Sequence, residues 1–157
     1  MLLVPATFLT AITKAAEAAW PRECCGLLAG RDHGQDTIVV TRVKPSENLT
    51  TGEAEDSFEV DPQVRFDLMR ALEHTDKRIV GHYHSHPNGR AEPSATDLAK
   101  AYEPDLIWVI VAVAGGRAAP PRAFVVKADK SGFDEIAVTP TNQADMTAKK
   151  EKGSARP

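Results

Sequence analysis

The stretch GHYHSHPNGRAEPSATD at residues 81–97 constrains the fold of this chain more than any other part of its sequence. Alternate residues of a β-strand face the same side of a sheet, so His82, His84 and His86 would share one face if the stretch begins as a strand. Pro87 is poorly suited to continue such a strand, because it has no backbone N–H to donate. The pattern predicts a strand that ends in a row of histidines, followed by a turn.

Two interpretations of these side chains are open. A row of histidines can be a solvent-facing edge, and Ser94 with Asp97 three residues later is typical of a helix N-cap with an acidic first turn. Alternatively, the ten residues between His86 and Asp97 suffice for the chain to fold back and bring the carboxylate to the imidazoles. Two imidazoles and one carboxylate are a common ligand set for catalytic zinc. Burying several titratable side chains together without a partner is costly, so the combination favours a metal site at His84, His86 and Asp97.

Hydrolysis at a zinc site also needs a general base, because metal coordination lowers the pKa of water to roughly 7 and a carboxylate completes its activation. Glu23 is the most suggestive candidate. It stands in PRECCGLLAG, at the entry to a short apolar strand, where a charged side chain lies at the end of a sheet. Other acidic residues at strand ends remain alternatives at this point.

The composition is that of one globular domain. The chain has 157 residues, of which 42% are hydrophobic and 26% charged. Its formal net charge of −3 gives no general attraction to nucleic acid or to an anionic membrane, so neither is expected as a partner. Cys24 and Cys25 are adjacent and predict no internal disulfide, which favours a reducing compartment. The first twenty residues resemble neither a signal peptide nor a membrane span, and a cytoplasmic location is expected.

Helices and strands interleave along the chain. Apolar periodicity, capping residues and breakers predict helices over 7–19, 62–72 and 94–102, and strands over 25–29, 37–43, 78–84, 106–112, 123–126 and 133–138, with a loop over 45–56. Thr7 and Asp61 are the expected N-caps of the first two helices. The segment 139–157 lacks apolar periodicity. We therefore expect an α+β (α/β layered) domain at 1–138 with a mixed sheet, and a flexible C-terminal tail at 139–157.

ECCGLLAG followed by GHYHSHPNGRAEPSATD resembles the JAMM (MPN+) zinc metalloprotease family. The signature of that family is an upstream glutamate, then His-x-His, ten residues and an aspartate. The matching positions are Glu23, His84, Ser85, His86, Pro87, Pro93, Ser94 and Asp97. The short segments between them are similar to those of compact prokaryotic members. The resemblance implies a curved mixed sheet flanked by helices, similar in architecture to cytidine deaminases.

The resemblance also implies residue roles. His84, His86 and Asp97 would hold one Zn²⁺ per chain, Glu23 would be the general base, and Ser94 would stabilise the oxyanion. Family members hydrolyse the bond after the C-terminal glycines of ubiquitin and ubiquitin-like proteins, and the prokaryotic branch is linked to sulfur carriers. The expected function is a metallopeptidase or isopeptidase acting after the Gly-Gly of such a carrier.

Two alternatives accompany this expectation. The first is a non-catalytic scaffold of the same fold that binds a ubiquitin-like partner. The second is a hydrolase of small amides, which is disfavoured because the chain lacks the downstream Pro-Cys-x-x-Cys stretch of deaminases. The sequence leaves open which carrier is cut, whether the adduct is to cysteine or lysine, and the oligomeric state.

Overall fold

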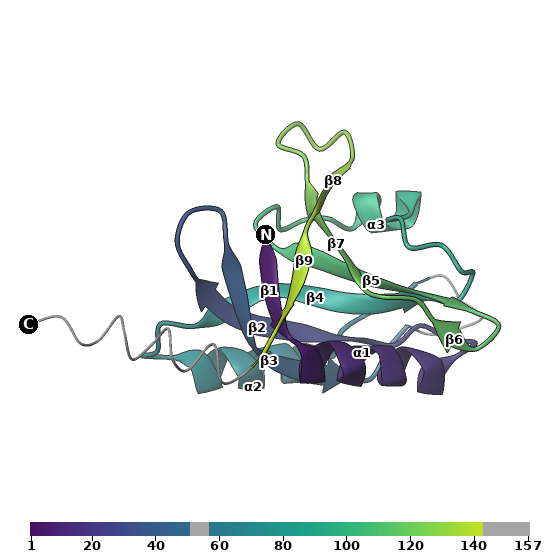
Figure 1. Ribbon diagram of the computed structural model, residues 1–157, viewed down its shortest axis with the longest axis horizontal. Helices are drawn as coiled ribbons and strands as arrows, with labels where there is room; N and C mark the ends of the chain where they lie inside the picture. Colours follow the sequence, from purple (N-terminus) through teal and green to yellow (C-terminus); the bar gives the residue numbers. More distant parts are fainter. Residues whose placement is uncertain (51–56, 143–157) are drawn as a thin grey trace, which may run out of the picture.

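The computed structural model of the protein describes residues 1–50 and 57–142. These residues form a nine-stranded mixed sheet in the order β8-β7-β5-β4-β2-β3-β1-β9, with the short β6 pairing β5 outside this path (Figure 1). The strands are β1 (Leu2–Pro5), β2 (Cys25–Asp32), β3 (Ile38–Ser46), β4 (Arg78–His86), β5 (Ile107–Ala114), β6 (Arg117–Ala118), β7 (Arg122–Val126), β8 (Phe133–Ile136) and β9 (Val138–Thr141). The helices are α1 (Ala6–Ala19), α2 (Pro62–Leu72) and α3 (Ala95–Ala99).

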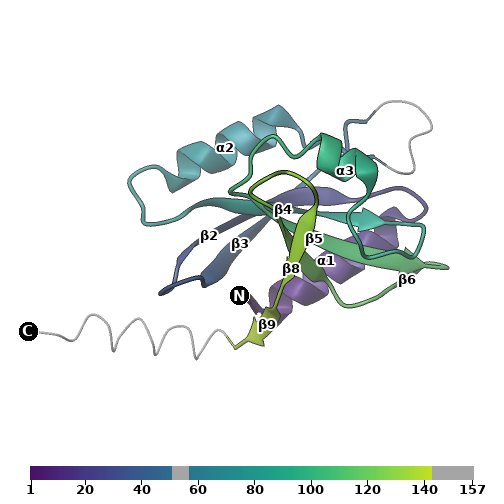
Figure 2. The ribbon, with the colours of Figure 1, turned by 90° about the horizontal axis from the view of Figure 1, so that it is seen from above.

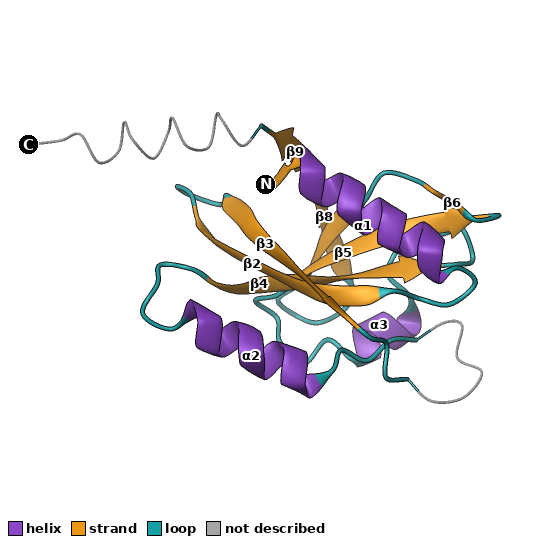
Figure 3. Cartoon of the chain, turned by 90° about the horizontal axis from the view of Figure 1, so that it is seen from below, coloured by secondary structure: helices purple, strands orange, loops and turns teal. Residues whose placement is uncertain are grey.

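The helices cover both faces of the sheet. Figures 2 and 3 show α1 on one face and α2 with α3 on the other. Successive residues of a strand point to opposite faces, so Leu28 packs with Ile12 of α1 while Leu27 packs with Leu68 of α2. This two-sided burial explains why the central strands read as continuous apolar runs. The predicted α+β class with a curved mixed sheet is confirmed.

Strand β4 lies at the centre of the sheet and positions the histidines. It pairs antiparallel with β2 and parallel with β5, which sets His84 opposite Cys25 on one side and Ile110 on the other. Gly81 allows β4 to approach β5 closely, because a Cβ there would overlap the carbonyl oxygen of Ile107. The start of β2 and the end of β4 therefore meet at one edge of the sheet.

The sequence located the start of one helix correctly and another incorrectly. Helix α2 begins as predicted, with the Asp61 carboxylate accepting the Gln63 N–H at 2.9 Å and Pro62 in the first position. Helix α1 begins at Ala6, and Pro5 occupies its N-cap without a side-chain hydrogen bond. Thr7 is therefore not the N-cap that the sequence predicted. Strand β1 runs directly into the helix, which leaves no turn for a capping hydroxyl.

The ends of the domain differ from the prediction. Residues 138–141 form β9, which pairs in parallel with β1, so a tail beginning at Thr139 is wrong for the first residues of that segment. Val138 is partly buried against the main core, and this packing explains why the segment forms a strand instead of a flexible tail. Residues 143–157 of the predicted tail and 51–56 of the predicted loop lie outside the described residues. Among the described helices, none is long and apolar enough to cross a membrane.

Smaller differences concern the lengths of elements. Strand β3 continues through Pro45 and Ser46, which were expected in a loop, and β4 continues to His86. Helix α3 ends at Ala99 rather than at Tyr102. Strands β1, β6 and β9 were not predicted, because strands of two to four residues carry too little periodicity to be recognised.

Candidate metal centre

His84 and His86 at the end of β4 meet Asp97 from the first turn of α3, and all three residues are buried. The two Nε2 atoms lie 3.0 Å apart. Asp97 Oδ2 is 3.1 Å from His86 Nε2, and Asp97 Oδ1 is 3.4 Å from His84 Nε2. Tetrahedral zinc with bonds of about 2.0–2.2 Å places its ligand atoms roughly 3.3–3.5 Å from one another. The donor set therefore fits one zinc ion with little adjustment.

Each imidazole is held in orientation by a different interaction. His86 Nδ1 lies 2.9 Å from the Arg90 carbonyl oxygen, an acceptor only, so Nδ1 carries the proton and Nε2 presents its lone pair to the cluster. The His84 ring stacks on Phe58, with centroids 4.2 Å apart, and its Nδ1 has no hydrogen-bond partner in the described part of the chain. On the Nδ1 side, packing against Phe58 rather than a hydrogen bond orients this second imidazole.

Asp97 is held by the reciprocal capping of α3. The Ser94 N–H donates to Asp97 Oδ2 at 2.8 Å, and the Asp97 N–H donates to Ser94 Oγ at 3.0 Å. Sequence reasoning had offered capping and metal binding as alternative interpretations of this pair. The two are compatible here, because the capping box turns the carboxylate toward the histidines.

The electrostatics of the cluster favour an anionic carboxylate. Burial opposes the ionisation of Asp97, but hydrogen bonds with His84 and His86 hold the pKa of its carboxyl well below the ordinary range. Burial lowers the pKa of His84. For His86, burial acts in the same direction, but the hydrogen bond and charge of Asp97 outweigh it and raise the pKa. The site thus contains a carboxylate anion beside two imidazole nitrogens, the ligand chemistry that zinc selects.

Glu23 reaches the cluster from the segment just before β2 and is buried. Its Oε1 lies 3.9 Å from His86 Nε2. Glu23, His84 and His86 also offer ligand atoms within 4.8 Å of one another, so Glu23 is a second possible carboxylate ligand. The shorter distances of Asp97 to both imidazoles favour Asp97 as the third ligand and leave Glu23 beside the metal position.

Two polar side chains fix the backbone around Glu23. The Cys24 N–H donates to Ser85 Oγ at 2.8 Å, and the Ser85 N–H donates to the Cys24 carbonyl at 3.1 Å. Asn48 Nδ2 donates to the Glu23 carbonyl at 3.2 Å and to the Ser57 carbonyl at 3.0 Å. Ser85 is one of the positions that match the family signature. Asn48 was not identified, because nothing in its local sequence indicates contact with a residue 25 positions away.

Other residues considered at the sequence level lie outside the cluster. His82 is partly buried between Phe58 and Trp108, with ring centroids at 5.5 and 4.3 Å, and burial lowers its pKa to about 3. Burial raises the pKa of the Cys25 thiol to about 12, and it also raises that of Cys24. These thiols remain protonated at neutral pH and are unsuited to act as nucleophiles.

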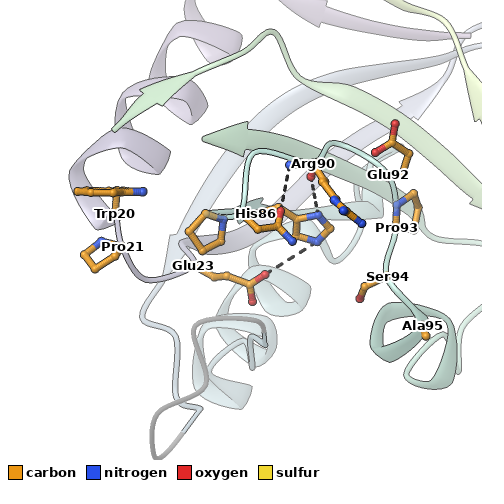
Figure 4. A pocket seen from close by; sticks show the side chains of 11 residues that line it. Trp20, Pro21, Glu23, His86, Arg90, Glu92, Pro93, Ser94 and Ala95 are labelled. Carbon is orange, nitrogen blue, oxygen red and sulfur yellow. Dashed lines mark hydrogen bonds and ion pairs between the residues drawn. The ribbon is translucent and has the colours of Figure 1, made fainter. Parts of the chain in front are cut away.

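The cluster opens into a cleft of about 950 Å³. Its lining residues are Trp20, Pro21, Glu23, His86, Pro87, Asn88, Arg90, Glu92, Pro93, Ser94 and Ala95. Figure 4 shows Glu23 on one side of His86 and Arg90 and Ser94 on the other. A substrate in this cleft would contact Glu23, His86 and Ser94 together, which is the arrangement that metal-assisted hydrolysis requires.

Residues 5–127 match the model of a family described as prokaryotic homologs of the JAB domain. The chain belongs to this family. The predicted resemblance to the compact prokaryotic branch of the JAMM/MPN+ proteins is therefore confirmed, and the chain is placed among JAMM-type proteases.

Curated relatives of this JAB-family chain carry the names of peptidases. A desampylase of Haloferax volcanii is 37% identical over 90 residues, which cover 57% of this chain and 62% of the relative. A CysO-cysteine peptidase of Mycobacterium tuberculosis is 33% identical over 71% of this chain and 73% of the relative. A probable TtuB-protein conjugate cleaving protease of Thermus thermophilus is 36% identical over 81 residues, which cover 52% of this chain and 50% of the relative. The alignments thus span only part of each relative.

Solved structures agree on the fold. Protein DSY2949 of Desulfitobacterium hafniense superposes with a TM-score of 0.76 at 29% identity, and the superposition covers 90% of this chain and 94% of the DSY2949 chain. AF2198, a JAB1/MPN domain protein of Archaeoglobus fulgidus, superposes with a TM-score of 0.52 at 17% identity, covering 90% and 98%. The second likeness shows a shared fold alone.

Proposed function

We propose that this JAB-family chain is a zinc-dependent peptidase that hydrolyses the bond after the C-terminal Gly-Gly of a ubiquitin-like or sulfur-carrier protein. The observation that carries the proposal is the convergence of two buried imidazole Nε2 atoms and the Asp97 carboxylate at one point, with the Glu23 carboxylate beside it. The substrate class is supported by the relatives, whose names refer to desampylation and to CysO and TtuB conjugates.

The placement of the residues supports a role for each of them. Zinc held by His84, His86 and Asp97 would polarise the scissile carbonyl and allow water to attack near neutral pH. Glu23 would take the proton of the attacking water and pass it to the leaving amine, because its carboxylate lies beside the metal position, 3.9 Å from His86 Nε2. The new carbon–oxygen bond forms first, and the carbon–nitrogen bond then breaks as the amine nitrogen takes the proton, which leaves the carrier carboxylate and a free amine.

Ser94 would stabilise the negative charge that develops on the carbonyl oxygen. Its Oγ accepts the Asp97 N–H and keeps its own hydrogen for donation toward the cleft. Capping and oxyanion stabilisation therefore use different parts of one hydroxyl. Ser94→Thr keeps both functions and should retain turnover, whereas Ser94→Ala should lower kcat by about 10²-fold or more.

The proposal is tested with zinc-loaded protein and a carrier that ends in Gly-Gly bonded to an amine. Glu23→Gln preserves the shape of the side chain but cannot accept a proton, so it should bind one zinc ion per chain and lose turnover. Glu47→Gln, which changes an exposed acid outside the cleft, is the matched control and should keep the wild-type rate. A wild-type protein that binds zinc and the carrier but releases no amine would instead favour the scaffold alternative.

A further inference from the structure

Trp20 places a large apolar ring in the active-site cleft. The residue is 43% exposed and lines the cleft. Of the large apolar residues that are exposed within 1–50 and 57–142, Trp20 alone lines this cleft. A tryptophan combines a large contact area with few rotatable bonds, which suits it to binding surfaces. The ring is therefore available to the molecule that occupies the cleft.

The end of α1 and a neighbouring turn hold this ring in place. The Trp20 N–H donates to the Glu17 carbonyl at 3.3 Å, and the Arg22 N–H donates to the Ala19 carbonyl at 2.9 Å. A Cβ at Gly116, in the turn between β5 and β6, would lie 3.9 Å from Cε3 of the indole. The turn therefore supports one edge of the ring. A surface that is formed in advance loses little conformational freedom when a ligand binds.

Trp20 lies on the same side of the metal centre as Glu23. Three peptide units connect the two residues, so their Cα atoms are at most about 11 Å apart. Figure 4 shows Trp20, Pro21 and Glu23 on one side of His86 and Ser94 on the other. The Trp20 and Pro21 rings thus form an apolar wall on the side of the cleft that carries the proposed base.

The proposed roles of Glu23 and Ser94 orient the substrate across the cleft. A base that passes its proton to the leaving amine must lie close to that nitrogen, which places the nitrogen on the side of Glu23. The carbonyl oxygen points toward Ser94, on the opposite side. The carbon chain attached to the leaving nitrogen then extends toward the wall formed by Trp20 and Pro21.

We infer that Trp20 is a specificity-determining residue, which binds the carbon chain attached to the leaving nitrogen and so favours leaving groups with an aliphatic stem over smaller ones. This inference rests on the proposed function and describes the same site. A carbon chain that lies on the indole face is removed from water. The cleft-lining charges other than Glu23 belong to Arg90 and Glu92, which lie on the side of Ser94. A neutral stem at the wall therefore leaves both of these charges in contact with solvent.

The test compares two conjugates of one carrier ending in Gly-Gly, the first with n-butylamine and the second with methylamine. The scissile bond is the same in both, and the stems differ by three methylene groups. For zinc-loaded wild type, kcat/KM should be about 5- to 10-fold higher for the butylamide, because the indole covers one face of the stem. The contact exists in ground and transition states alike, so the difference should appear mainly in KM.

Three variants assign the preference to the indole. Trp20→Ala should reduce the butyl-to-methyl ratio to about two or less, and Trp20→Phe should retain most of it. Phe66→Ala removes another exposed aromatic ring, on α2 and outside the cleft, and should keep the wild-type ratio. The ratio compares two substrates of one sample, so it does not depend on the fraction of folded protein. Zinc content of the same samples shows whether the metal centre is retained.

Fluorescence provides a measurement that needs no turnover. The chain has two tryptophans, and Trp108 is only 3% exposed, so acrylamide should quench mainly Trp20. The butylamide conjugate, bound at saturation to zinc-loaded Glu23→Gln, should protect Trp20 from acrylamide more than the methylamide does. Trp20→Phe should show almost no quenching with either conjugate.

Two groups of results would contradict the inference. Equal kcat/KM for both amides in the wild type, a preference that survives in Trp20→Ala, or equal protection of Trp20 by both conjugates would overturn it and leave the proposed function standing. Cleavage of neither conjugate by the zinc-loaded wild type would overturn both.

Discussion

The placement of Glu23 depends on groups far from it in the sequence. Ser85 and Asn48 bind the backbone on either side of this residue, through the Cys24 N–H and the Glu23 carbonyl. Ser85 belongs to the recognisable motif, whereas Asn48 lies in a segment that reads only as a polar turn. Residues that bind a metal or accept a proton are predictable from residue type and spacing. Residues that position them through the backbone become visible only in the folded chain.

His82 predicts how stability depends on pH. Its pKa is lowered to about 3 in the folded chain, whereas an unfolded imidazole titrates near 6.5. Between these values the unfolded chain binds a proton that the folded chain does not. The free energy of unfolding should therefore fall by about 1.4 kcal/mol per pH unit as the pH drops below about 6.5.

The variant His82→Phe removes this titration and retains an aromatic ring between Phe58 and Trp108. Urea unfolding of metal-free protein between pH 7 and pH 5 should show a shallower dependence for the variant than for the wild type. Some dependence should remain, because burial also lowers the pKa of His84. Equal slopes for the two proteins would contradict the burial of a neutral His82.

At the scale of elements, β4 carries two of the three proposed metal ligands and pairs closely with β5. Gly81→Ala introduces a Cβ that overlaps the Ile107 carbonyl oxygen, and the two strands would have to separate. We expect a loss of about 1–3 kcal/mol in the free energy of unfolding, with weaker zinc binding because His84 lies on the displaced strand.

Gly132→Ala is the matched control for this substitution. A Cβ at Gly132 meets no atom within 4 Å, and the change should alter the free energy of unfolding by less than about 0.5 kcal/mol. Chemical denaturation of both variants checks the pair. If Gly81→Ala were as stable as Gly132→Ala, close approach would not be the reason for a glycine at position 81.

At the scale of the whole molecule, the ends of the described chain close one edge of the sheet. Strand β1 lies between β3 and β9, and the Leu2 N–H donates to the Ala137 carbonyl at 2.8 Å. A chain ending at Ala137 loses β9 and the packing of Val138, which should cost about 1 kcal/mol or more. A chain ending at Asn142 keeps every described pairing and should unfold at a higher Tm than the chain ending at Ala137. Equal Tm values for the two truncated chains would contradict a structural role for β9.

Much of this architecture could be predicted from the sequence, and the omissions share a cause. Apolar runs identified the central strands, and the Asp61–Pro62 pair identified the start of α2. Strands β1 and β9 pair with each other although more than 130 residues separate them in the sequence. A local sequence pattern cannot predict such a pairing. For the same reason, the motif predicted that His84, His86 and Asp97 lie together but did not indicate that Phe58 stacks on His84.

The zinc content of purified protein tests the account most directly, because two carboxylates compete for the third ligand position. Zinc per chain is measured by mass spectrometry on the wild type, His86→Ala, Asp97→Asn and Glu23→Gln after the same dialysis. The account predicts about one equivalent in the wild type and in Glu23→Gln, and little in the other two. Retention by Asp97→Asn together with loss from Glu23→Gln would contradict it, because Glu23 would then be a ligand rather than the base.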